Sequence, residues 1–110
     1  MVMMNIDRNV YEEKVLSSRL PALLCFYRNT VVHSETVNVI KELSHHFESV
    51  PFYSVQEDEH EFFFGKFHFL GTPIFIFLAN GSERGRLLGS VSRDRLRVFI
   101  ENNISELNTQ

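Results

Sequence analysis

Cys25 is the only cysteine in the chain, and its thiol is the most reactive side chain that the sequence contains. A single cysteine excludes an internal disulfide and a dithiol reaction within one chain, although it allows a mixed disulfide with glutathione or with a second subunit. That reaction needs an exposed thiol of low pKa. Cys25 instead lies inside the apolar run "PALLCFY", residues 21–27, where burial raises a thiol pKa. We therefore expect Cys25 to pack as a small hydrophobic side chain.

The five histidines do not have the spacing of a metal site. His45 and His46 are adjacent on an expected helix and diverge, while His60 and His68 are eight residues apart and lack a cysteine or paired carboxylate in a ligand pattern. The glycines after residue 80 are spaced along an expected hairpin and not between a strand and a helix, so they form no phosphate-binding loop. We expect no metal and no cofactor.

Ser34 and His33 are the remaining pair that joins a hydroxyl to a base. Adjacent residues on a helix point about 100° apart, and the sequence places no acid to orient the imidazole. A serine hydroxyl without a base that activates it is a poor nucleophile. No hydrolytic site is therefore expected at this pair.

The elements that must position these residues follow from hydrophobic periodicity and turn residues. Apolar runs predict strands at residues 2–5, 21–27, 52–56, 73–79 and 84–90, and helical periodicity predicts helices at residues 8–18, 30 or 34 to 49, 58–69 and 92–104. Asp7 or Asn9 and Ser92 are expected helix N-caps, and Asn80-Gly81 is the expected turn of a hairpin. Strand-helix alternation followed by a hairpin predicts a mixed sheet with helices on both faces, because strand-helix-strand crossovers are right-handed.

Length and composition predict one globular domain over residues 1–110, with 44% apolar and 23% charged residues. Fourteen acidic residues outnumber eleven basic ones, and the arginines between residues 84 and 97 alternate with acids, so no nucleic-acid partner is expected. The longest apolar run, residues 73–79, is too short to cross a bilayer, and the first ten residues lack a signal-peptide pattern. No membrane association is expected, and a cytoplasmic location is the default.

Eleven phenylalanines are many for a chain of 110 residues, and five of them fall between residues 62 and 69. Phe63 and Phe67 share one helical stripe, whereas Phe62 and Phe64 lie off it on opposite sides. One face of a helix cannot bury all of these rings. We therefore expect one or two of them to be partly exposed, as in a protein contact or a dimer interface.

Three local signatures, taken with this order of elements, resemble the thioredoxin family over nearly the whole chain. They are "LLCFY" followed by a long helix, "GTP" at residues 71–73 opening an apolar strand, and "NG" before a returning strand with Gly89 and the final helix "SRDRLRVFIENN". The interval from Asp58 to Pro73 is also similar to the family's interval between the third strand and its proline. The resemblance implies an α/β thioredoxin fold, a three-layer α/β/α arrangement with a central mixed sheet of four to five strands and about four helices.

The family's Cys-Gly-Pro-Cys motif corresponds here to Val31, Val32, His33 and Ser34, with Thr30 where an aromatic residue usually precedes it. The motif is reactive because a helix N-terminus stabilises the first thiolate and the second thiol resolves the mixed disulfide. Neither valine nor serine supplies such a thiolate. The resemblance therefore implies a thioredoxin-like protein that has no dithiol redox activity and is not an enzyme.

Pro73 resembles the family's cis proline, and a cis bond there leaves the backbone of Thr72 open to an extended partner segment. By this resemblance the chain binds a polypeptide, in a chaperone-like or assembly role, in a groove made of Thr30, Val31, Val32, His33, Thr72, Pro73, Leu88, Gly89 and Ser90. Two alternatives stay open. One is a single-cysteine thiol-disulfide oxidoreductase that uses Cys25, and the other is a structural homodimer joined through the Phe-rich helix.

Overall fold

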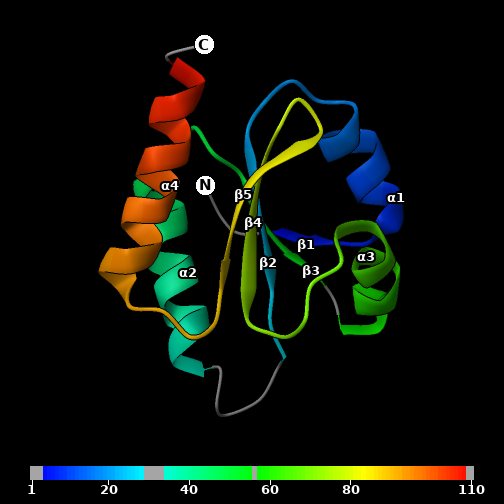
Figure 1. Ribbon diagram of the computed structural model, residues 1–110, viewed down its shortest axis with the longest axis horizontal. Coiled ribbons are helices and arrows are strands. Elements are labelled where there is room, and N and C mark those ends of the chain that lie inside the picture. The colour runs from blue at the N-terminus through cyan, green and yellow to red at the C-terminus, as the bar shows by residue number, and fades with distance from the viewer. Residues whose placement is uncertain (1–3, 29–33, 56, 109–110) are drawn as a thin grey trace.

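The computed structural model describes residues 4–28, 34–55 and 57–108 (Figure 1). Within these ranges, five strands form one sheet in the order β1-β3-β2-β4-β5. Their bounds are β1 Met4–Ile6, β2 Ala22–Phe26, β3 Phe52–Val55, β4 Ile74–Ala79 and β5 Ser82–Leu88. β1, β3 and β2 run parallel, whereas β4 pairs antiparallel with β2 and β5 pairs antiparallel with β4. The α/β class and the mixed sheet predicted from the sequence are confirmed.

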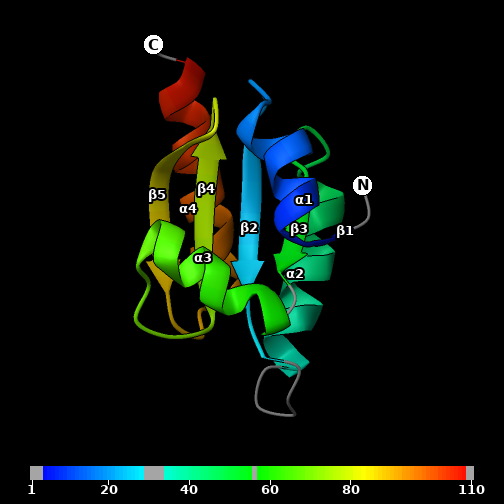
Figure 2. The same ribbon diagram turned by 90° about the vertical axis from the view of Figure 1, so that its right-hand side faces the viewer.

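Helices cover both faces of this sheet, which gives the molecule three layers (Figure 1, Figure 2). One face is covered by α1 (Arg8–Val10), by its π-helical continuation η1 (Tyr11–Leu16), and by α3 (His60–Phe67), into which the short η3 (Glu57–Glu59) leads. The other face is covered by α2 (Ser34–His46) and α4 (Arg93–Asn108). Segments distant in the sequence, such as α1 and α3, therefore share one core.

The alternation of side chains along β2, the central strand, divides the core into two clusters. Leu24 and Phe26 belong to the cluster under η1 and α3, and Leu23 and Cys25 belong to the cluster under α2 and α4. Because successive strand residues face opposite sides, a strand covered on both faces needs an uninterrupted apolar run. Every residue of β2 and of β4 is buried, which confirms the prediction made from these two apolar runs.

Local capping and turn signals act as the sequence predicts. The Val10 N–H donates a hydrogen bond to Asp7 Oδ1 at 2.9 Å, and the Arg95 N–H donates to Ser92 Oγ at 3.2 Å. Each bond satisfies an amide that the first turn of a helix leaves unpaired. Asn80-Gly81 joins β4 to β5 with φ angles of 55° and 74°, the left-handed values that a two-residue hairpin turn requires.

Several bounds differ from the sequence prediction. The helix expected at residues 8–18 ends at Leu16, the one expected at 58–69 is η3 followed by α3 and ends at Phe67, and the strand expected at 84–90 is Ser82–Leu88. α2 ends at His46, because the following residues turn to bury Phe47 and Val50, and the Val50 N–H donates to the Phe47 carbonyl at 3.1 Å. α4 continues to Asn108, since Leu107 still packs against the core cluster under α2 and α4. In both cases the contact of an apolar residue with the core, buried for Phe47 and half-buried for Leu107, decides where the helix stops.

Candidate functional site

Two of the three predicted groove segments lie side by side at the carboxyl end of β2. Ile74 pairs with Phe26 on one side and with Leu88 on the other, and the Gly89 N–H donates to the Pro73 carbonyl at 2.8 Å. The peptide bond between Thr72 and Pro73 is cis. The structure therefore brings Thr72 and Pro73 next to Leu88, Gly89 and Ser90. The third segment, Thr30, Val31, Val32 and His33, lies outside the described residues.

The surface around Thr72 is accessible. Pro73 is buried and Thr72 and Gly89 are half-buried, whereas Ser90 is exposed and Leu88 is 52% exposed. No residue in the described ranges is hydrogen-bonded to the Thr72 backbone. Its N–H and C=O are thus available to an extended segment that lies beside Thr72, just before the first residue of β4.

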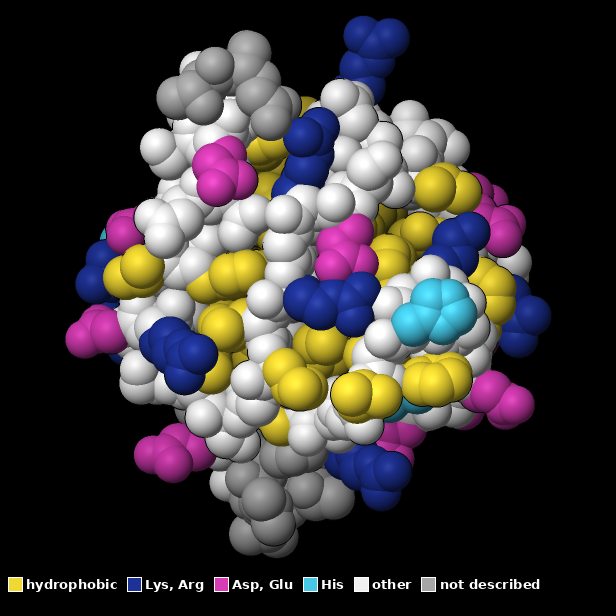
Figure 3. Space-filling model, in the orientation of Figure 1, with side chains coloured by type: hydrophobic (Ala, Val, Ile, Leu, Met, Phe, Trp, Pro, Cys, Tyr) yellow, Lys and Arg dark blue, Asp and Glu magenta, His cyan; other side chains and the backbone are white. Residues whose placement is uncertain are grey.

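A pocket of about 610 Å³ opens beside Thr72, between α3 and the loop that leads into β4. Its walls combine three apolar side chains, Phe64, Phe69 and Leu70, with four polar or charged ones, and Leu70 is exposed to 94% and Phe64 to 49%. Figure 3 shows hydrophobic side chains gathered on this face, near the end of β5 that leads to α4 and beside α3. We call this pocket the anchor pocket, and its described lining residues are Arg28, His60, Glu61, Phe64, Phe69, Leu70, Gly71 and Thr72.

Ring contacts fix the floor of the anchor pocket. The ring centroid of Phe69 lies 4.8 Å from that of Phe26 and 5.8 Å from that of Phe64. His60 packs edge-on against Phe26 at 5.7 Å, and its Nε2 lies 3.1 Å from the Val55 carbonyl oxygen. Aromatic pairs in this range of distances and angles attract one another, so the floor is held in one arrangement.

Ser90 lines a second hollow, of about 480 Å³, on the other side of the predicted groove. This hollow lies between the first turns of α2 and α4 and is lined by Glu35, Thr36, Val39, Ser90, Val91, Ser92 and Arg93. The described residues of the predicted groove therefore border two hollows, one at Thr72 and one at Ser90. Thr72 borders the more apolar hollow and Ser90 the more polar one.

Cys25 lies in the middle of β2 and has an exposed fraction of 0%. Its side chain belongs to the core cluster under α2 and α4, and burial raises the pKa of the Cys25 thiol well above its usual range. A thiol in such surroundings stays protonated and out of reach of solvent. The prediction that Cys25 packs as a hydrophobic side chain is confirmed.

The Phe-rich helix is divided between core and surface. Phe63 and Phe67 are buried, Phe62 is half-buried and Phe64 is 49% exposed, which confirms that one face of α3 cannot bury them all. Phe64 is therefore the exposed ring. The sequence predicted exposed rings on this helix but did not predict that Leu70 is exposed beside them. Leu70 lies beyond the end of the helix, where helical periodicity gives no information about exposure.

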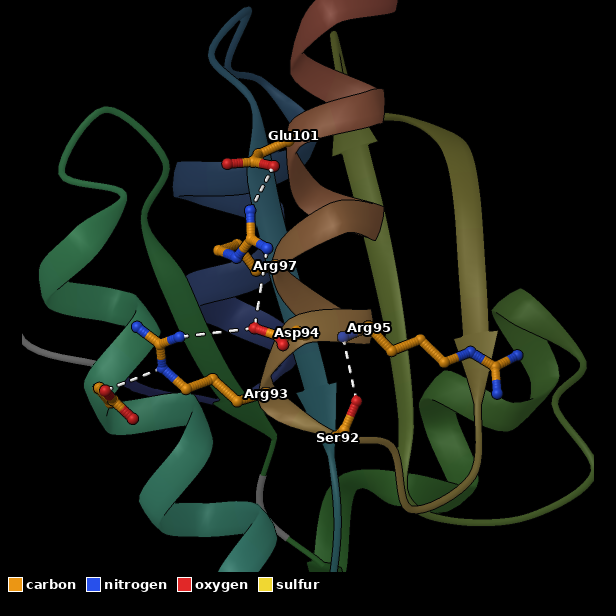
Figure 4. A network of polar contacts seen from close by, with 7 residues as sticks. Ser92, Arg93, Asp94, Arg95, Arg97 and Glu101 are labelled. Atoms are coloured by element: carbon orange, nitrogen blue, oxygen red, sulfur yellow. Dashed lines mark hydrogen bonds and ion pairs between the residues drawn. The ribbon is translucent and has the colours of Figure 1, made fainter.

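Two arginines of α4, Arg93 and Arg97, pair with acids, as the alternating charges of the sequence indicate (Figure 4). Arg93 Nε lies 2.8 Å from Glu42 of α2, and Arg97 lies 2.9 Å from Glu101. Asp94 stands 3.7 Å from both guanidinium groups. These side chains are 32–77% exposed, and ion pairs in such surroundings contribute about 0–1 kcal/mol each. The Arg93–Glu42 pair links α4 to α2, but the network contributes little to the stability of the fold.

No protein-family model matches the chain, and no curated protein matches it. None of the helices in the described ranges combines the length and the apolar character needed to cross a membrane. Among the same residues, no group of three or more His, Cys, Asp or Glu side chains could hold a metal ion. A function must therefore be argued from the geometry of the surface itself.

Proposed function

We propose that this chain has a thioredoxin fold and binds an extended polypeptide segment, without dithiol chemistry, in a chaperone-like or assembly role. Three parallel strands followed by an antiparallel hairpin, with helices on both faces, support that fold. The sequence has Val31 and Ser34 in place of the family's two cysteines, and its single cysteine is buried. Binding a polypeptide requires no cysteine, and it is therefore the activity that we propose for this surface.

The unpaired backbone of Thr72 is the observation that carries the proposal. It is flanked by Leu70, two residues earlier and 94% exposed, and by Leu88, which is 52% exposed and pairs with Ile74 two residues later. An extended segment that hydrogen-bonds Thr72 would cover both leucines. Large apolar side chains that share one surface patch mark protein contacts, so the hydrogen bonds and the apolar contact favour the same kind of partner.

The test titrates a permanently unfolded polypeptide, a reduced and carboxymethylated small protein, into the ¹⁵N-labelled chain. We expect amide shifts centred on Thr72, Gly89 and Ser90, and we expect Leu88→Asp to weaken binding by at least about tenfold, because the contact would desolvate a charge. Leu20→Asp is the control, since Leu20 is 66% exposed and precedes β2, at the opposite end of the sheet from Thr72. Equal losses in the two variants, or shifts centred elsewhere, would refute the proposal.

The single-cysteine oxidoreductase needs a thiol that reaches solvent. Because Cys25 has no exposed surface, we expect a thiol reagent to modify it only when the protein unfolds. The rate of modification, measured in native and in denatured protein across pH, checks this. Rapid modification of the native protein below neutral pH would favour the oxidoreductase over the binding module.

A further inference from the structure

We infer that the anchor pocket receives a large apolar side chain of the bound polypeptide, and that a basic residue beside this side chain pairs with the acidic rim of the pocket. The inference rests on the proposed function and names the chemistry of the partner: an extended segment in which a phenylalanine or leucine has lysine or arginine neighbours. It is carried by the shape of the pocket, by its position beside Thr72, and by the charges around it.

The shape of the anchor pocket fits an apolar side chain. Its volume of about 610 Å³ lies within the range of ≈ 300–1,000 Å³ that is common for binding pockets in proteins. Phe69 is 6% exposed and supplies a fixed floor, while Phe64 and Leu70, 49% and 94% exposed, form walls that water now covers. Covering such walls with an apolar group is favourable by roughly 25 cal/mol for each Å² removed from water.

The pocket lies at the right place for a segment that pairs with Thr72. Thr72 itself lines the pocket, so a residue that hydrogen-bonds its backbone lies at the pocket's edge. Side chains of an extended chain alternate between two sides, with about 3.3 Å between successive residues. A neighbouring residue of that segment therefore points into the pocket while the backbone hydrogen bonds are kept.

The charge around the pocket favours a basic residue next to the apolar residue of the bound segment. Four acids, Glu57, Asp58, Glu59 and Glu61, fall within η3 and the start of α3, and Glu61 lines the pocket. Two arginines offset part of this charge: Arg28 lines the pocket, and Arg8 lies 3.4 Å from Glu59 and stacks over Phe62. Among these six side chains the acids outnumber the arginines by two, and Asp58 and Glu61 are both exposed. The lining of the pocket itself has one acid, Glu61, and one arginine, Arg28, so the negative excess comes from the acids of η3 next to it. A cationic side chain at this rim is attracted by the acids, whereas an anionic one is repelled.

The test uses labelled peptides of about twelve residues, long enough to cross the groove as an extended strand. Each has a background of Gly, Ser and Asn, and binding is followed by fluorescence anisotropy. The first peptide has one central Phe between two Lys, the second has Ala in place of Phe, and the third has Glu in place of each Lys. We expect the first to bind at least about tenfold more tightly than the second, from lost apolar burial, and several-fold more tightly than the third.

Two variants of the chain, each with a matched control, assign the effect to the pocket. Leu70→Ser should weaken the Phe peptide and leave the Ala peptide unchanged, while Glu61→Lys should reverse the preference between Lys and Glu peptides. The controls are Leu20→Ser and Glu48→Lys, which alter other exposed side chains, at the opposite end of the sheet, and should change neither preference.

The outcomes separate this inference from the proposed function. Equal binding of the Phe and Ala peptides, or loss of binding in a control as large as in its partner variant, overturns the inference. Binding by none of the peptides overturns it too, and the amide shifts at Thr72 with the unfolded polypeptide then decide whether the proposed function falls with it. A mass that doubles with concentration and returns to that of a monomer in Leu70→Ser assigns the pocket to a second copy of the chain.

Discussion

Cys25 and Thr72 show opposite effects of their surroundings. The Cys25 side chain has no exposed surface and its thiol has a raised pKa, so burial removes the chemistry of which a cysteine is capable. Thr72 has no unusual side chain, yet its backbone is without a hydrogen-bond partner among the described residues. At the scale of single residues, the described surface therefore offers backbone hydrogen bonds at Thr72, whereas the Cys25 thiol does not reach it.

The raised pKa of Cys25 predicts a loss of stability at alkaline pH. In the unfolded chain the thiol ionises near its usual value of 9.0, whereas the buried thiol keeps its proton. Above that pH the unfolded state binds fewer protons than the folded state, so the free energy of unfolding falls as pH rises. We expect the contribution of this thiol to fall by about 1.4 kcal/mol between pH 8 and pH 10.

Urea unfolding of the wild type and of Cys25→Ala at the two pH values measures that contribution. Tyr11 and Tyr53 also have raised pKa values from burial, but both tyrosines are present in both proteins. The stability advantage of the wild type over Cys25→Ala should therefore shrink at the higher pH. An advantage that stays constant would mean that the thiol ionises equally in the folded and unfolded states.

At the scale of elements, α3 decides which aromatic rings reach the surface. Phe63 and Phe67 lie one turn apart and pack with Tyr11 of η1, at ring distances of 5.2 Å and 6.1 Å. Phe64 is rotated off that stripe by one residue and is 49% exposed. A dimer seam on this helix would therefore have to use Phe64, whereas a charge at Phe63 would disrupt the core.

The role of α3 predicts the behaviour of Phe64→Asp. We expect the wild type and this variant to sediment as monomers of about 12.9 kDa. The variant should lose about 1–2 kcal/mol of unfolding free energy, because Asp removes the buried half of the ring and its contact with Phe69. A wild-type dimer that Phe64→Asp dissociates would favour the homodimer alternative. Sedimentation velocity at several protein concentrations makes the distinction.

Gly81 and Gly89 both have a positive φ, but only at Gly81 would an added side chain also collide with a neighbouring atom. Gly81, in the turn between β4 and β5, has a φ of 74°, and an added Cβ would lie 2.5 Å from the Leu16 carbonyl oxygen. Gly89 has a φ of 104°, and an added Cβ would meet nothing within 4 Å. Gly89→Ala should cost about 1–2 kcal/mol of strain, and Gly81→Ala should cost at least about 1 kcal/mol more. Equal losses on urea unfolding would show that η1 moves aside.

At the scale of the whole molecule, Arg86 joins β5 to the end of α3. Its Nη2 donates to the Phe67 carbonyl at 2.7 Å and its Nη1 donates to the His68 carbonyl at 3.3 Å, while Glu83 lies 2.6 Å from Nη2. The hydrogen bonds that Arg86 donates to the Glu83 carboxylate raise the pKa of Arg86. Carbonyls at the end of a helix lack partners within it, so the guanidinium completes α3 and holds the start of the loop that forms a wall of the anchor pocket.

This bridge predicts that Arg86→Ala lowers the free energy of unfolding by about 1–2 kcal/mol, because the carbonyls lose a charged donor at a partly exposed site. Arg95→Ala is the control, since the Arg95 side chain is exposed on α4, and it should change stability by less than about 0.5 kcal/mol. Thermal and urea unfolding of both variants provide the comparison. Equal small effects would mean that water replaces the guanidinium at the end of α3.

The sequence predicts the order of the elements because each signal for them is local. The apolar run at residues 22–26 requires a strand covered on both faces, Asp7 and Ser92 satisfy amides of the next turn, and Asn80-Gly81 adopts left-handed values over two residues. The helix ends were less well predicted. Phe47 and Leu107 reach their core positions through contacts with other elements, and a single periodic pattern does not report those contacts.

The sequence by itself determined that this chain has no dithiol, that its one cysteine falls within an apolar strand, and that strands and helices alternate before a final hairpin. Only the tertiary structure decided what surrounds Thr72. The anchor pocket joins Arg28 after β2, Glu61 on α3 and Leu70 in the loop before β4, and they meet because β2 and β4 are neighbours in the sheet. Periodicity describes the two sides of one element, whereas a pocket depends on how several elements pack together.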